Sequence, residues 1–190
     1  MKVRLSLFVL VAAVTSCATA PPQAPKEFID EQTANTLLAV ASPLVFARDR
    51  SDVAARARDY VNLEGLEIDA SGKYRQYLLT YRWSTVDPRM SPSPPSAAGE
   101  LLIIADGREI VLKPLDQLPI GLPLRGELLV PNHGAVSVHA YLADVAMLHF
   151  IAESRVISVR LPQEPFDRPF ALWEDGRVAL KQFLTHAATR

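Results

Sequence analysis

The residues most suited to chemistry include four histidines, and one of them has a neighbour at a spacing that could bind a metal. His149 and Glu153 stand four residues apart in a segment with helical apolar spacing, so both side chains would lie on one helix face. A zinc-protease helix needs a second histidine at this spacing and a glutamate beside the first. The chain has neither, so the pair predicts an exposed helix face and no metal site.

The other three histidines fall in settings that need no ligand to explain them. His133 belongs to the turn sequence Pro131-Asn132-His133-Gly134, and His139 alternates with apolar residues as in a strand. His186 stands near the end of a predicted helix, where a positive charge is mildly favoured. The sequence therefore gives none of them a catalytic role.

The sequence contains no local motif for nucleophilic catalysis either. The chain has no Gly-x-Ser-x-Gly elbow and no Ser-x-x-Lys, and Ser154 and Ser158 lack an activating neighbour. The acidic pairs Asp30-Glu31 and Glu174-Asp175 flank predicted turns, and the glycines form no phosphate-binding loop. We therefore predict no catalytic residue and no cofactor.

A group of aromatic and arginine residues is a better candidate for recognition. Arg58, Tyr60, Arg82 and Trp83 fall on two neighbouring predicted strands, and Tyr, Trp and Arg dominate binding hot spots. These four residues form a candidate face for a protein partner. The alternative is that Trp83, with the tyrosines at alternate positions before it, is the buried side of a sheet.

The N-terminus predicts export. A cationic start, Met1-Lys2-Val3-Arg4, precedes an apolar run from Leu5 to Val14, as in a secretory signal. As a helix this run spans about 15 Å, about half of the hydrocarbon core of a bilayer, so it is too short to cross a membrane. Val14-Thr15-Ser16-Cys17 then resembles the lipobox of bacterial lipoproteins, and Cys17 is the only cysteine in the chain.

The lipoprotein resemblance implies a membrane anchor. Residues 1–16 would be a signal peptide, removed after the Cys17 thiol is acylated, and two or more acyl chains would hold the protein stably. Residues 17–35 would be a flexible tether, with Pro21, Pro22 and Pro25 as an extended spacer. Because Ala18 follows the cysteine, the resemblance favours the inner leaflet of the outer membrane, facing the periplasm.

Three further segments are similar to blocks of uncharacterised proteobacterial lipoproteins. They are Pro43-Leu44-Val45-Phe46-Ala47-Arg48, Ala57-Arg58-Asp59-Tyr60-Val61 and Trp83-Ser84-Thr85-Val86-Asp87-Pro88-Arg89. This resemblance implies the same location and supplies no activity.

Two hairpins dominate the predicted fold. Alternation between residues 60 and 86 predicts a long hairpin, and a change of apolar parity at Gly65 predicts a bulge there. Asp106-Gly107 between apolar runs predicts a second hairpin within 100–115. The Pro/Ser-rich stretch 87–99 between them predicts a mobile loop.

The remaining elements complete an α+β domain over residues 36–190. Leu37–Val40 and Leu44–Ala47 predict strands near its start, and apolar stripes predict helices over about 142–153 and 176–187, with Asp175 as an N-cap. The helices should pack on a mainly antiparallel sheet or sandwich.

Charge and motifs together suggest a function class. The net charge of −1, without a basic run, gives no sign of nucleic-acid binding. We predict a non-catalytic accessory or interaction domain, anchored in the envelope, that binds the membrane through its lipid and an envelope protein as partner. The alternatives are a carrier for a small apolar or lipid ligand, since 49% of the residues are apolar, and a hydrolase without a local motif.

Overall fold

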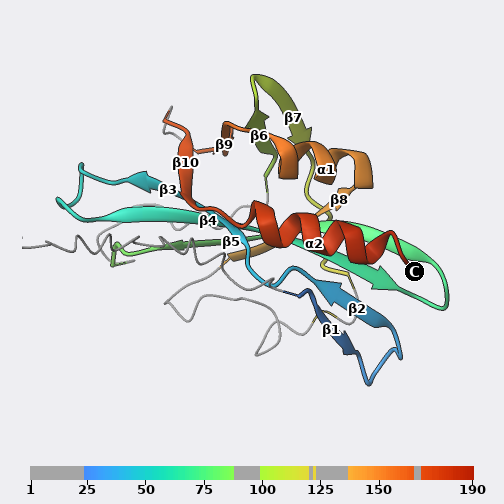
Figure 1. Cartoon of the computed structure of the whole chain (residues 1–190). Helices are drawn as coiled ribbons and strands as arrows, with labels where there is room; N and C mark the ends of the chain where they lie inside the picture. Colours follow the sequence, from blue (N-terminus) through green and yellow to red (C-terminus); the bar gives the residue numbers. More distant parts are fainter. Residues whose placement is uncertain (1–23, 88–98, 120–121, 123–136, 165–167) are drawn as a thin grey trace, which may run out of the picture.

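The computed structural model describes residues 24–87, 99–119, 122, 137–164 and 168–190. These residues form an α+β fold in which a mostly antiparallel sheet carries two helices near the C-terminus, as the sequence predicts (Figure 1). The strands are β1 Lys26–Ile29, β2 Thr36–Ala39, β3 Leu44–Asp49, β4 Arg58–Asp69, β5 Tyr74–Ser84, β6 Leu101–Ala105, β7 Arg108–Leu112, β8 Ser137–Ala143, β9 Ile157–Arg160 and β10 Phe170–Glu174. The helices are α1 Val145–Glu153 and α2 Arg177–Ala187.

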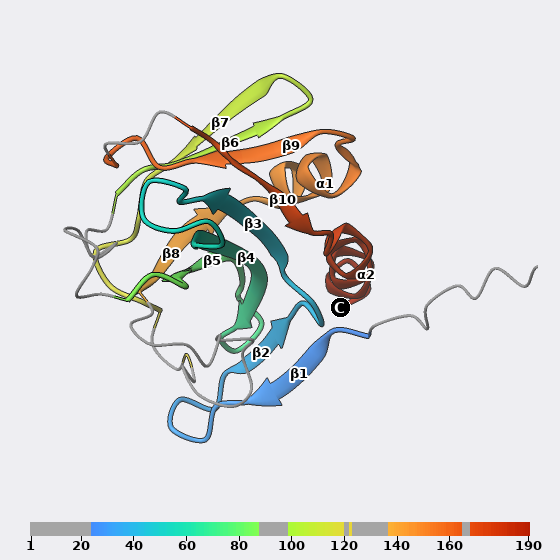
Figure 2. The same ribbon diagram turned by 90° about the vertical axis from the view of Figure 1, so that its left-hand side faces the viewer.

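The sheet is one curled half-barrel. One edge of β4 pairs with both β2 and β3, and the other edge pairs with β5, which continues to β8. From β3 the sheet continues through β10, β9, β6 and β7, which lie above β3, β4, β5 and β8 in Figure 2. Pro114, just after β7, bridges to Tyr141 of β8, so the curl brings the two ends of this path together.

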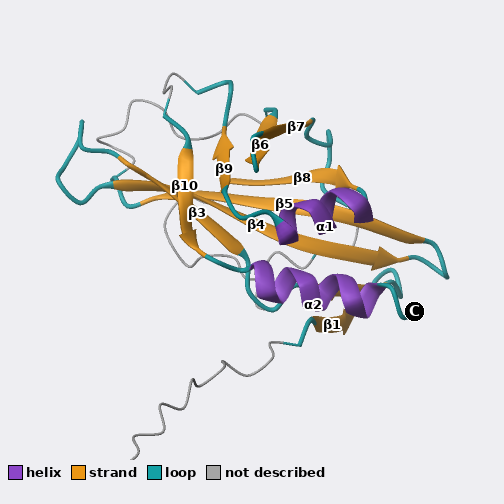
Figure 3. Ribbon diagram, turned by 45° about the horizontal axis from the view of Figure 1, so that its top comes forward, coloured by secondary structure: helices purple, strands orange, loops and turns teal. Residues whose placement is uncertain are grey.

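The curl gives the sheet an inner face with the larger core. Side chains such as Phe46, Val61 and Leu78 point inward and pack with Leu148 of α1 and Phe183 of α2 in one apolar cluster. Figure 3 shows the two helices side by side against the sheet. The opposite, outer face carries a second and smaller cluster. The strands in the middle of the sheet are therefore buried on both sides.

The predicted bulge at Gly65 is wrong. The register of β4 with β5 runs without a shift from Asp59 opposite Ser84 to Asp69 opposite Tyr74. The apolar parity changes because β4 is buried on both faces: Val61 belongs to the inner cluster and Leu66 to the outer one. At Gly65 a Cβ atom would lie 3.2 Å from Leu180, so the glycine lets α2 pack closely on the strand.

The Asp106-Gly107 hairpin is confirmed between β6 and β7. Both turn residues have positive φ, 46° and 82°, as a two-residue turn of this twist requires. The Asp106 carboxylate also accepts hydrogen bonds from the backbone N–H groups of Arg155 and Val156. These bonds hold the pKa of the Asp106 carboxyl below its ordinary value and attach the hairpin to the start of β9.

Both helices are confirmed, with shifted starts. α1 begins after Asp144, whose carboxylate accepts a hydrogen bond from the Met147 N–H, so Leu142 belongs to β8 and is 58% exposed. The N-cap of α2 is Gly176, not Asp175. A Cβ atom at residue 176 would lie 2.3 Å from the Pro43 carbonyl oxygen, so this position requires glycine. Asp175 still accepts a hydrogen bond from the Arg177 N–H.

The domain extends further toward the N-terminus than predicted. Residues 26–29 form β1, paired with β2, so the boundary of the tether at residue 35 is wrong. This strand begins with the polar residues Lys26 and Glu27, Phe28 packs on the outer cluster, and Ile29 is exposed. The predicted signal peptide, Cys17 and most of the predicted mobile loop lie outside the described residues. No helix in the described part of the chain is long and apolar enough to cross a membrane.

Candidate functional site: an aromatic face and a buried ion network

Three of the four predicted recognition residues lie together on the outer face. Tyr60 on β4 stands directly opposite Trp83 on β5, and their rings stack at 4.0 Å between centroids with an interplanar angle of 6°. The Trp83 indole N–H donates to the Asn62 Oδ1 atom at 3.1 Å, which fixes the ring further. Paired aromatic side chains on facing strands are a common stabilising unit of a sheet.

The sequence did not indicate the most exposed member of this group, Trp173. β10 has a bulge between Leu172 and Glu174, which leaves Trp173 without a directly opposed residue on β3. Because Leu172 packs on the inner cluster, the next residue, Trp173, points to the outer face. Its ring meets Tyr60 edge to face at 6.4 Å, and the Arg58 guanidinium lies 4.4 Å above it. Trp173 is 52% exposed. Because only Ala47 separates Tyr60 from β10 on this face, the large rings can approach each other.

We call Arg58, Tyr60, Trp83 and Trp173 the aromatic face. Arg58 is partly exposed and held by an ion pair of 2.8 Å with Asp49, which raises the pKa of its guanidinium. The group therefore presents one accessible indole ring beside an oriented cation. This is the arrangement of residue types that carries most of the energy in protein interfaces.

The fourth predicted residue, Arg82, does not belong to this face. It neighbours Trp83 on β5, so its side chain points to the opposite, inner face, and it is only 2% exposed. The alternative of buried aromatics holds for Tyr77 and Tyr81, which are 7% and 0% exposed in the outer cluster. Beside the Glu64 carboxylate, burial raises the pKa of the Tyr81 hydroxyl.

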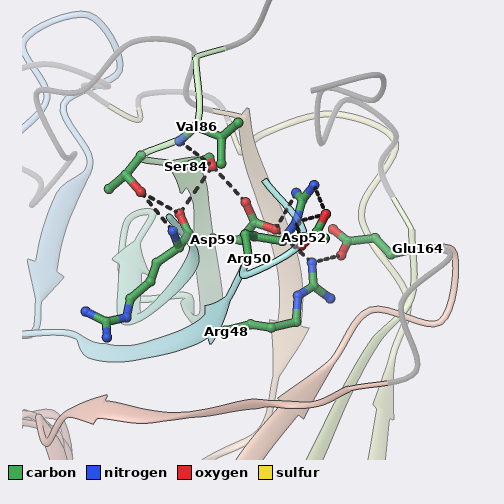
Figure 4. Close-up of polar contacts among 9 residues, drawn as sticks. Arg48, Arg50, Asp52, Asp59, Ser84, Val86 and Glu164 are labelled. Carbon is green, nitrogen blue, oxygen red and sulfur yellow. Dashed lines mark hydrogen bonds and ion pairs between the residues drawn. The ribbon is translucent and has the colours of Figure 1, made fainter. Parts of the chain in front are cut away.

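A buried ion network closes the inner face at the end of the half-barrel where β3 ends and β4 begins (Figure 4). Asp59 accepts from two arginines through one oxygen: Arg48 at 3.0 Å and Arg50 at 3.1 Å. Its other oxygen accepts from the Ser84 hydroxyl at 2.7 Å. Both arginine side chains are at most 6% exposed. No local motif predicts this network, because its members come from β3, the loop after β3, β4 and β5.

The network also ties the C-terminal part of the sheet to β3. Arg48 donates to Glu164, after β9, at 2.7 Å, and its guanidinium lies 4.2 Å above the Phe170 ring on β10. The Ser84 hydroxyl, which donates to Asp59, also accepts from the Val86 backbone N–H at 3.0 Å, so it joins β4 to the end of β5. The network therefore acts as a structural clamp between distant strands.

The other predicted chemistry residues remain separate. His149 and Glu153 are both exposed on α1. Glu153 lines an open groove that also contains Asp175 and Arg177, but His149 does not. The Ser154 hydroxyl is buried and donates to the Ile151 carbonyl. Within the described residues no three metal-ligating side chains come together. His133 lies outside them.

His139 on β8 is expected to make stability depend on pH. Burial and, secondly, the nearby Arg82 cation lower the pKa of the His139 imidazole from its ordinary value of 6.5. The unfolded chain therefore binds a proton more readily. The contribution of the neutral His139 imidazole to stability is complete above about pH 6.5, and it is lost as the pH falls from there toward the pKa of the folded state.

Urea unfolding at pH 7.5 and 5.5 measures this effect. We expect the midpoint of the native chain to fall at pH 5.5 more than that of His139→Asn, which cannot take up the proton. A His186→Asn variant is the control, because His186 is exposed on α2. Equal pH dependence in the native chain and in His139→Asn would show that this histidine is not responsible.

No family model, curated protein or solved structure matches this chain.

Proposed function

We propose that this chain is an envelope lipoprotein, anchored through Cys17, whose domain binds a protein partner as a non-catalytic accessory. The lipobox-like Val14-Thr15-Ser16-Cys17 and the proline-containing spacer behind it support the anchor. We place the domain on the periplasmic side of the outer membrane. The short stretch between Cys17 and Lys26, where β1 begins, would then hold the domain close to the lipid surface.

The observation that carries the partner proposal is the aromatic face. A tryptophan that is 52% exposed costs solubility, yet Trp173 stands on the outer face beside Arg58. The Tyr60–Trp83 stack fixes the surroundings before binding, so little side-chain entropy remains to be lost. The face therefore suits a flat apolar patch on a protein that also offers an acceptor to Arg58.

Trp173→Ala is expected to weaken partner binding by about 2 kcal/mol, or about 30-fold in affinity. The domain itself should stay folded, because the Trp173 side chain is largely exposed. Val178→Ala on α2 is the control: Val178 is 67% exposed, but lies on a different element. An affinity unchanged by Trp173→Ala and by Arg58→Ala would exclude this face.

Crosslinking in intact cells provides the experiment. A benzophenone amino acid replaces Ala171, which is exposed next to Trp173, and in a second strain it replaces the exposed Leu142 on β8. We expect light to give one discrete protein adduct from position 171 that disappears when Trp173→Ala is added. Adducts that are the same from both positions, or that survive Trp173→Ala, would contradict the proposal.

The carrier alternative has less support. The inner cluster is filled by side chains that are almost fully buried, including Phe46, Tyr141 and Phe183. Among the described residues, the part of the inner face that packs with the two helices is therefore a filled core. The carrier and the hydrolase stay predictions, and a native mass spectrum of the chain with a bound lipid would favour the carrier.

A further inference from the structure

A polar site lies on the inner face of the β5–β8 ladder. Thr80 stands directly opposite His139, and Arg82 stands directly opposite Ser137. Because side chains at alternate positions share a face, all four point to the inner side, at one end of the half-barrel. Directly opposed residues have Cβ atoms about 5 Å apart, so the four polar groups are immediate neighbours.

Three atoms of this site are buried and have no hydrogen-bond partner among the residues that the structure describes: the Thr80 Oγ1, the Ser137 Oγ and the His139 Nε2. Thr80 as a residue is 0% exposed. Each unsatisfied buried polar group costs about 1–3 kcal/mol, and folded proteins keep few of them. Three at adjacent positions on two neighbouring strands indicate that the site is completed by something that hydrogen-bonds to all three.

The charge of the site selects the kind of ligand. The buried Arg82 guanidinium donates to the Tyr141 hydroxyl at 3.2 Å, and this hydroxyl donates to the Gly99 carbonyl at 2.9 Å. Arg82 therefore supplies a fixed positive charge in a setting of low dielectric constant. Two hydroxyl groups and one imidazole nitrogen beside it can all donate hydrogen bonds. A cation or an apolar molecule would leave these donors unpaired or meet like charge.

We propose that Thr80, Ser137, His139 and Arg82 bind one small oxyanion, of the carboxylate or phosphate class, on the inner face of β5 and β8. The oxyanion accepts hydrogen bonds from the two hydroxyl groups and from the Nε2 of the neutral imidazole, and it faces the Arg82 charge. This site is separate from the aromatic face on the outer side, so the proposal does not depend on the proposed function.

The test measures the thermal unfolding of the full-length chain, purified in detergent, against inorganic phosphate and against acetate. Sodium chloride keeps the ionic strength constant. We expect the transition temperature to rise by about 5 °C at 50 mM of the better anion and to saturate in the millimolar range. Comparison of the two anions distinguishes a phosphate-like from a carboxylate-like ligand.

Two variants remove one donor each with little change of shape, Thr80→Val and Ser137→Ala. Without anion, Thr80→Val should be as stable as the native chain or more so, because an unsatisfied hydroxyl is gone. With anion, either variant should lose at least tenfold in affinity. Ser158→Ala on β9 is the control, since Ser158 alternates with the inner residue Val159 and points away from this site. General salt stabilisation would appear equally in all these chains.

The nitrogen resonances of the His139 ring give a second readout that needs no variant. In the native chain they should shift saturably with the same anion midpoint as the thermal stabilisation. No saturable shift in either measurement, or an equal response in Thr80→Val, would overturn the proposal. Ordered water alone at the site, with no response to either anion, would overturn it as well.

Discussion

Replacing Asp59 with alanine is expected to lower the free energy of unfolding by about 3–5 kcal/mol. Asp59 is the shared acceptor of two arginine side chains that are each at most 6% exposed. Without it, Arg50 keeps the more exposed Asp52 and Arg48 keeps Glu164, but the positive charges face each other across the empty position. Removing one partner of a buried pair costs more than the pair contributes, because a desolvated charge stays behind.

The matched control for this prediction is Asp49→Ala. Asp49 forms an ion pair of 2.8 Å with Arg58, but its side chain is 70% exposed, and exposed pairs contribute less than about 1 kcal/mol. Urea unfolding of the full-length chain, followed by circular dichroism, measures both variants. If Asp59→Ala and Asp49→Ala lose similar amounts, the network is not the clamp that its burial indicates.

The local part of the fold could be predicted from the sequence. Alternation gave the β4–β5 strands, and Asp106-Gly107 gave the second hairpin, because both depend on residues that are close along the chain. The mistake at Gly65 has a tertiary cause. A parity change reads as a bulge only when one face of the strand is exposed, and β4 is covered on both. The helix that needs Gly65 stands more than a hundred residues later.

The candidate face was predictable in part for the same reason. Arg58, Tyr60 and Trp83 belong to one hairpin, so the pattern could group them. Arg82 was grouped with them wrongly, because adjacent residues of a strand point to opposite faces, a rule that the sequence already offered. Trp173 could not be placed, since β10 joins this face only through its pairing with β3. The Arg48–Asp59–Glu164 network is long-range in the same way.

Replacing Cys17 with serine is expected to abolish lipid attachment completely. Acylation requires a thiol, and serine keeps the size of the residue while offering only a hydroxyl, which is far less nucleophilic. Because the chain has no other cysteine, no second thiol can take up the lipid. Cells fed radioactive palmitate should label the native chain and leave Cys17→Ser at background. Cleavage that waits for acylation should fail too, so the variant should keep residues 1–16 and their mass.

The domain should not change in this variant. The first described strand, β1, begins at Lys26 and is bonded to β2, so it does not involve Cys17, and circular dichroism and the urea midpoint should match the native chain. Ser16→Ala is the matched control, since it keeps a small residue beside the cysteine and should retain both label and cleavage. Palmitate incorporated by Cys17→Ser would show that the anchor lies elsewhere. A native chain that is cleaved without any label would show an ordinary signal peptide, and the aromatic face would then act without a membrane tether.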